Sequence, residues 1–162
     1  MMEKTAYSRK DFKLCIVLDN IRSAFNVGSI FRTADATGSA EIYLCGITPR
    51  PDNPKLYKTA LGATGSVNSL YFSNTIDAIG KLKEQNTPVY SVEITPNSRH
   101  FQTVSYPKEL AIVLGHEIRG VNQKVLDLSD ETIYIPMLGE KKSLNVATAA
   151  GIVIYEALRG KI

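Results

Sequence analysis

Short apolar runs alternate with amphipathic stretches along this chain, and the pattern predicts strands and helices in turn. The strand-like runs are almost free of polar residues, which is typical of strands buried on both faces. The helix-like stretches repeat apolar residues every three or four positions. We therefore expect an α/β fold, with a mostly parallel sheet covered by helices on both faces. The expected strands are 12–18, 41–45, 67–72, 89–94, 110–114 and 132–135, and the expected helices are 26–37, 75–85, about 124–126 and 144–158, with a short helix within 56–66.

Length and composition favour one compact domain. The chain has 162 residues, 44% of them hydrophobic and 22% charged, which is ordinary for a globular protein with a single core. No apolar run approaches the ~18 residues that span a bilayer, and the first residues carry charges where a secretory signal needs an apolar run. Cys15 and Cys45 fall in expected strands without a CxxC pairing, which indicates buried thiols in a reducing compartment. We expect a cytoplasmic protein.

Basic residues are grouped rather than evenly spread. The net charge of +3 permits an acidic partner without demanding one. Phosphate contact is one interpretation of the groups, and an ordinary solvated surface is the other. The groups are Lys4, Arg9, Lys10 and Lys13 at the amino end, Arg50, Lys55 and Lys58 in one loop region, and Lys141 and Lys142 before the final helix.

Several familiar chemistries lack their sequence signatures. The chain has no GxxxxGK[ST] loop, no GxGxxG after a strand and no GxSxG elbow. His100 and His116 are the only histidines, and no cluster of cysteines or carboxylates has metal-ligand spacing. We expect neither a nucleotide-phosphate loop, nor a classical hydrolase triad, nor a metal site.

Polar residues converge in three segments that follow or precede the expected elements. In "NVGSIFRTADATG", Asn26 and Arg32 lie opposite an apolar helical stripe, so Arg32 could hold a phosphate or could simply be solvated. In "LGHEIRGVN", glycines bracket Glu117, which is either a site residue or the cap of the next helix. In "IPMLGEKKSLNVATAAGIVIYE", Ser143 is the expected N-cap, which leaves Asn145 as surplus polarity near the helix start.

Taken in order, these three segments resemble the motifs of the SpoU (TrmH-like) class of SPOUT RNA methyltransferases, and the resemblance covers Lys13 to Arg159. It implies a single SPOUT-type domain over residues 1–162, with a deep trefoil knot near the carboxyl end and no separate RNA-binding domain. It also implies a homodimer through the knot region. The implied activity is methyl transfer from S-adenosylmethionine, without a metal, to a ribose 2′-hydroxyl of tRNA or rRNA.

The resemblance also assigns site residues. The catalytic set it implies is Arg32, Asn26, Glu117, Ser143 and Asn145. The implied cofactor-binding set is Leu114, Gly115, His116, Gly120, Ile135, Pro136, Met137, Leu138, Ser143, Leu144, Asn145 and Ala147. Arg32 matches the family's catalytic arginine, and we assign it positioning and electrostatic assistance because a guanidinium stays protonated in proteins. The predicted RNA-binding set is Arg32, Arg50, Lys55, Lys58 and Lys141.

Two other functions remain open from the sequence. One is a catalytically silent RNA-binding dimer that keeps the fold as a scaffold. The intact set of Asn26, Arg32, Glu117 and Asn145 argues against such a loss of activity. The other is methylation of a base in place of a ribose.

Overall fold

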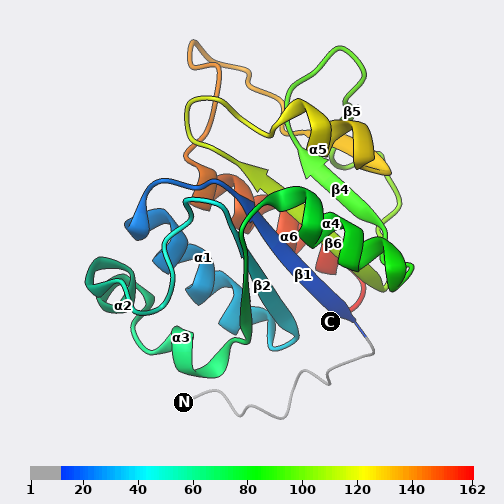
Figure 1. Ribbon diagram of the computed structural model, residues 1–162. Helices are drawn as coiled ribbons and strands as arrows, with labels where there is room; N and C mark the ends of the chain where they lie inside the picture. Colours follow the sequence, from blue (N-terminus) through cyan, green and yellow to red (C-terminus); the bar gives the residue numbers. More distant parts are fainter. Residues whose placement is uncertain (1–11) are drawn as a thin grey trace.

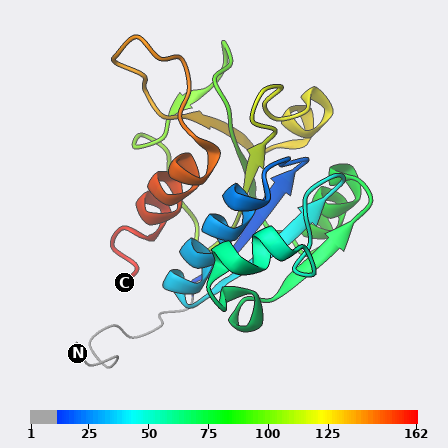
Figure 2. The same ribbon diagram turned by 90° about the vertical axis from the view of Figure 1, so that its left-hand side faces the viewer.

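The computed structural model describes residues 12–162, which form a parallel sheet between two layers of helices (Figure 1 and Figure 2). The sheet has seven strands in the order β3-β2-β1-β6-β4-β7-β5, and all neighbours run parallel. This confirms the expected α/β class. Lys4, Arg9 and Lys10 lie outside the described residues. The strands are β1 Lys13–Asp19, β2 Ala40–Cys45, β3 Ser69–Phe72, β4 Val89–Val92, β5 Arg99–His100, β6 Glu109–Gly115 and β7 Glu131–Tyr134.

The helices cover both faces of the sheet, as predicted. α1 and α6 lie side by side on one face, with α2 and α3 against α1, whereas α4 and α5 lie on the other (Figure 1 and Figure 2). The single short helix expected within 56–66 is instead split into two, because Leu61 and Gly62 adopt left-handed φ values of 49° and 90°. The helices are α1 Ala24–Thr37, α2 Pro54–Ala60, α3 Ala63–Ser66, α4 Thr75–Glu84, α5 Gln123–Leu128 and α6 Val146–Leu158.

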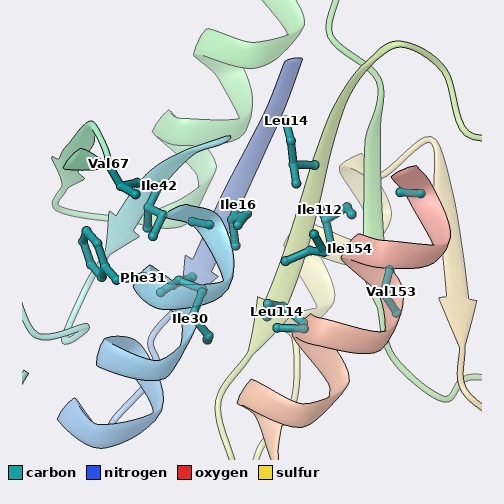
Figure 3. Packing of buried hydrophobic residues seen from close by; sticks show 14 of the residues in the cluster. Leu14, Ile16, Ile30, Phe31, Ile42, Val67, Ile112, Leu114, Val153 and Ile154 are labelled. Carbon is teal, nitrogen blue, oxygen red and sulfur yellow. The ribbon is translucent and has the colours of Figure 1, made fainter. Parts of the chain in front are cut away.

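The larger core lies between the sheet and the α1 and α6 layer (Figure 3). Ile16 of β1 and Ile112 of β6 meet Phe31 of α1 and Ile154 of α6, and each of the four is completely buried. Burying a side chain of this size contributes roughly 1.5–3 kcal/mol of transfer free energy. This packing fixes where α1 and α6 begin, at the carboxyl edge of the sheet.

The first turn of α6 differs from the sequence expectation. Ser143 was predicted to cap a helix beginning at Leu144, but the helix begins at Val146 and its N-cap is Asn145. The Asn145 Oδ1 accepts hydrogen bonds from two free N–H groups of the first turn, those of Ala147 at 2.9 Å and Thr148 at 3.2 Å. The cap prediction was wrong because both Ser and Asn are good caps and only the position of the helix decides between them.

The two cysteines behave as expected from their strands. Cys15 of β1 and Cys45 of β2 are both buried and unpaired. Burial raises the pKa of the Cys45 thiol to about 12 and holds that of Cys15 well above its ordinary value. No helix among residues 12–162 is long and apolar enough to cross a membrane.

Candidate active site

A cavity of about 530 Å³ opens at the carboxyl ends of β4, β6 and β7, beside the start of α6. Open α/β sheets bind their ligands at this edge. The segment 135–145, orange in Figure 1 and Figure 2, extends beyond the strand ends and forms part of its wall. Of the predicted cofactor-binding residues, those that line the cavity are Leu114, Gly115, His116, Gly120, Ile135, Met137, Ser143, Leu144 and Asn145.

Three predicted cofactor contacts do not line this cavity. They are Pro136, Leu138 and Ala147. The side chain of Leu138 is 95% exposed, so it points into solvent and not into the cavity. The apolar wall therefore comes from the strand ends and from Leu144 more than from the tip of the loop.

Gly115 lies where two stretches of backbone come into contact. A Cβ atom on Gly115 would lie 2.2 Å from the nitrogen of Val121 and 2.3 Å from the carbonyl carbon of Gly120. Gly120 itself has a φ of 70°, and a Cβ there would lie 2.1 Å from the carboxylate of Glu93. The two glycines thus allow the loop after β6 to fold back on itself, so the close neighbour of Gly115 is the chain itself.

His116 keeps that loop closed. Its Nδ1 accepts hydrogen bonds from the backbone N–H groups of Ile118 at 3.0 Å and Arg119 at 3.2 Å. Its own N–H and carbonyl pair with the carbonyl and N–H of Gly120 at 3.1 and 2.8 Å. His116 is 8% exposed and its hydrogen bonds are all to its own loop, so it orders one wall of the cavity.

Glu93 is a cavity residue that the sequence reasoning missed. Its carboxylate accepts hydrogen bonds from the N–H groups of Val121 at 3.0 Å and Ile94 at 2.9 Å. It therefore fixes the far end of the loop that His116 closes. The expected strand 89–94 included Glu93, but β4 ends at Val92. A carboxylate directly after a buried strand was the sequence signal that could have indicated this residue.

Glu117 joins the loop after β6 to the start of α1. Its carboxylate accepts hydrogen bonds from the backbone N–H groups of Arg22 and Ser23, both at 2.9 Å, and from the Nδ2 of Asn26 at 3.2 Å. The alternative that Glu117 caps the next helix is wrong, because Asn122 caps α5. A carboxylate here also suits the positive end of the α1 dipole.

The contact continues to the start of α6. The Oδ1 of Asn26 accepts a hydrogen bond from the Nδ2 of Asn145 at 3.0 Å. The Nδ2 of Asn26 donates to Glu117, and the Oδ1 of Asn145 caps α6. Glu117, Asn26 and Asn145 therefore form one continuous chain of hydrogen bonds. That chain fastens together three segments that lie far apart in the sequence.

The hydrogen bonds to Glu117 make its ionisation a stabilising feature. Burial alone would raise the pKa of Glu117, but the N–H groups of Arg22 and Ser23 and the amide of Asn26 lower it from the ordinary value of 4.5. A depressed pKa means that the carboxylate stabilises the folded state above pH 4.5. That contribution disappears as the pH falls through the folded-state pKa.

Glu117→Gln is therefore expected to lower the free energy of unfolding at pH 7 by about 1 kcal/mol, since an NH₂ group would face one of the backbone donors. The difference from the parent protein should shrink as the pH falls below 4.5. Urea unfolding at pH 7 and pH 4 measures both values. A difference of the same size at both pH values would contradict the assigned role of the carboxylate.

Arg32 lies on the exposed face of α1, less than two turns beyond Asn26. Val27, Ile30 and Phe31 occupy the opposite, buried face, as predicted. Within residues 12–162 the guanidinium makes no ion pair with a carboxylate. Its five donors are therefore available to a ligand that approaches the exposed face of α1.

The other predicted RNA-binding residues are all exposed. Arg50, Lys55 and Lys58 belong to α2 and the loop that precedes it, whereas Lys141 belongs to the segment before α6. The sheet order places these two groups on opposite sides of β1. Residues 12–162 contain no group of three or more His, Cys, Asp or Glu side chains that could hold a metal ion.

The arrangement of these segments can be compared with known proteins. A family model described as the SpoU rRNA methylase family matches residues 13–155, which include Asn26, Glu117 and Asn145. The chain belongs to the SpoU rRNA methylase family. The resemblance seen in the three sequence segments is thereby confirmed.

Curated and solved SpoU-type relatives cover nearly the whole chain. A Thermus thermophilus tRNA (guanosine(18)-2′-O)-methyltransferase is 33% identical over 154 residues, which are 95% of this chain and 78% of the relative. The AdoMet-bound rRNA methyltransferase of Sinorhizobium meliloti is 27% identical with a TM-score of 0.88, covering 96% of this chain and 59% of that one. A structure concerned with 2-OH methylation of C/U34 on tRNA is 26% identical to this chain with a TM-score of 0.83. The match covers 92% of this chain and 96% of the chain in that structure.

Proposed function

We propose that this protein is an S-adenosylmethionine-dependent RNA methyltransferase that acts on a ribose 2′-hydroxyl of tRNA or rRNA. The Thermus thermophilus relative is a tRNA 2′-O-methyltransferase, and a Bacillus subtilis relative, 31% identical over 158 residues, is a 23S rRNA (guanosine(2553)-2′-O)-methyltransferase. For this chain, the proposal depends on one observation. The hydrogen-bonded chain of Glu117, Asn26 and Asn145 fastens the helix of Arg32 to the rim of the cavity.

The cavity suits S-adenosylmethionine in size and chemistry. Its volume of about 530 Å³ falls in the usual range for small-molecule sites. Leu114, Ile135 and Leu144 offer apolar walls for an adenine ring, and the backbone of the loop after β6 offers polar contacts. When bound, this cofactor supplies a methyl group made electrophilic by its sulfonium. Its positive charge also suits a cavity that contains the Glu93 and Glu117 carboxylates.

Each of the site side chains then has its own role in the reaction. Arg32 holds a phosphate of the RNA by a bidentate contact and so sets the approach of the ribose oxygen. As the ribose oxygen takes the methyl group, the S–CH₃ bond of the bound cofactor would break and the hydroxyl proton would pass to water. The guanidinium would lower the cost of the negative charge that develops on the ribose oxygen. Asn26, Glu117 and Asn145 keep α1 and α6 in register with the cavity, and Ser143 lines its rim.

Calorimetric titration of the protein with S-adenosylmethionine tests the enzyme against the silent scaffold. We expect one site per chain, and no binding by folded protein would reject the enzyme. Nucleoside analysis of RNA from a strain that lacks the protein then tests ribose against base. Loss of a 2′-O-methylated nucleoside is the expected result. Loss of a base-methylated nucleoside would show instead that the protein methylates a base.

We also infer that two copies associate through α6. Ile152 and Tyr155 lie about one turn apart on α6 and leave 36% and 47% of their surface exposed. Leu144, two residues before the helix, is 38% exposed, and Phe25 of the adjacent α1 is 57% exposed. Apolar side chains grouped in this way typically mark a protein contact. Ala150 cannot belong to this contact, because it is completely buried against the core of its own chain.

Gly151→Arg is expected to yield monomers or insoluble protein, because the charged side chain would project from α6 about one turn from Tyr155. Nothing lies within 4 Å of a Cβ atom built on Gly151, so a side chain can leave the helix there without a clash at its base. Gly80→Arg on α4 is the matched control, since Gly80 is also helical with open space around it. Light scattering after gel filtration gives the mass of each, and a soluble Gly151→Arg dimer would contradict the placement.

Three further expectations belong to this proposal. They stay predictions: the segment before α6 is threaded as a trefoil knot, residues 1–162 form one SPOUT domain, and the protein is cytoplasmic. RNA is the substrate class that the relatives support, and the identity of the RNA is decided by the nucleoside analysis above.

A further inference from the structure

At the carboxyl edge of the sheet, away from the cavity and next to β3, an arginine lies on an exposed tyrosine. The guanidinium carbon of Arg50 is 4.4 Å from the centre of the Tyr71 ring. Tyr71 lies near the carboxyl end of the edge strand β3 and is 44% exposed. Its hydroxyl donates a hydrogen bond to the carbonyl of Gly46 at 3.1 Å. The ring is thus held in one orientation beneath the guanidinium.

This pair is not part of a network that neutralises charge. Within residues 12–162 Arg50 has no carboxylate at ion-pair distance. Between residues 46 and 60, Asp52 is the only acidic residue, whereas Arg50, Lys55 and Lys58 are basic and exposed. An ordered cation on an exposed ring, with further cations beside it, favours a polyanion that also offers flat rings.

Hydrogen bonds connect the pair to the catalytic centre. The N–H of Ile47 donates to the Oδ1 of Asn20 at 3.1 Å, and the N–H of Ile21 donates to the Oγ1 of Thr48 at 3.0 Å. The Thr48 side chain is 2% exposed, so this connection is buried. The next two N–H groups along the chain are those that bind Glu117. The loop that carries Arg50 is therefore braced against the loop that starts α1.

The sheet order sets the separation between the two places. β3 and β6 are three strand positions apart in the order β3-β2-β1-β6. At about 4.8 Å for each step, this amounts to roughly 14 Å along the carboxyl edge. A short single-stranded segment can bridge such a distance. A ligand of this length that extends from the cavity along the sheet edge toward β3 would reach Arg50 and Tyr71.

We propose that Arg50 and Tyr71 form a stacking platform for an unpaired base of the RNA substrate, close to the nucleotide that is methylated. Single-stranded RNA is recognised chiefly by stacking of splayed bases on aromatic rings and arginine planes. Lys55 and Lys58 supply the contacts to the adjoining phosphates. The inference rests on the proposed function, because it takes RNA to be the substrate.

The test uses a single-stranded RNA dodecamer that contains 2-aminopurine, whose fluorescence is quenched when the base stacks. Arg50→Lys keeps the charge but removes the flat guanidinium, and Tyr71→Leu removes the ring. We expect both variants to bind the probe about tenfold more weakly and to lose the quenching. Lys58→Ala is the matched control: its affinity should become less dependent on salt, while the bound probe stays quenched.

Two results would overturn the platform. One is Arg50→Lys with the affinity and quenching of the parent protein, which would make Arg50 a phosphate contact alone. The other is an absence of quenching by the parent protein at saturation, as expected if this surface binds another protein. Titration of every variant with S-adenosylmethionine separates this failure from that of the proposed function. A parent protein that binds no cofactor rejects the enzyme, whereas normal cofactor binding with unaltered RNA binding by Arg50→Lys rejects only the platform.

Discussion

Arg32→Ala is expected to abolish methyl transfer while leaving the binding of S-adenosylmethionine nearly unchanged. The side chain projects from the exposed face of α1 and does not line the cavity, so its loss removes a contact to RNA and none to the cofactor. Removing one preorganised electrostatic contact typically lowers the rate 10²–10³-fold, or about 2.7–4 kcal/mol. Transfer of a radiolabelled methyl group to unfractionated tRNA and rRNA gives the rate, and calorimetry gives the cofactor affinity.

Arg32→Lys is the control for charge. A lysine keeps the positive charge but not the two-pronged contact, so a partial loss of rate is expected. If alanine at this position weakens cofactor binding as much as it slows transfer, the assignment of Arg32 to the RNA is wrong.

Gly115→Ala should reduce cofactor affinity more than a hundredfold. A methyl group at this position would lie 2.2 Å from the nitrogen of Val121, and its near neighbours are all backbone atoms, which cannot rotate aside. The loop after β6 would have to move away from the strand and change the shape of the cavity. We also expect a cost of about 1–3 kcal/mol in the free energy of unfolding, as for other overpacked sites.

Gly80→Ala is the matched control for Gly115→Ala. Nothing lies within 4 Å of a Cβ atom on Gly80, and it lies within α4, so alanine should stabilise the protein by about 0.5–1 kcal/mol. Calorimetry with the cofactor and thermal unfolding compare the two variants. Normal cofactor binding by Gly115→Ala would show that the tight turn is not needed to shape the site.

The hydrophobic pattern predicted the sheet well because parallel strands are buried on both faces. The run "LAIVL" was expected at 110–114, and β6 extends from Glu109 to Gly115. The short strand β5 escaped prediction, since Arg99 and His100 carry no apolar signal and pair only through β7. Strands of two residues depend on their neighbours more than on their own composition.

The candidate site was predicted in its parts but not in its connections. The segments with Asn26, Glu117 and Asn145 stood out by their polarity, yet the hydrogen bond between Asn145 and Asn26 joins residues 119 positions apart. Such a contact follows from the packing of α1 against α6, which no local pattern encodes. The same reason explains why Glu93 and the stacking of Arg50 on Tyr71 emerged only from the structure.

The buried cysteines have a practical consequence for studying this protein. A thiol must ionise to be alkylated at an ordinary rate, and both Cys15 and Cys45 are shielded from reagents and hold their protons. Because they are the only two cysteines in the chain, a third placed at an exposed position such as Lys141 would be the sole reactive one. A fluorophore could then be attached beside the cavity of the native protein, with no need to remove the cysteines that fill its core.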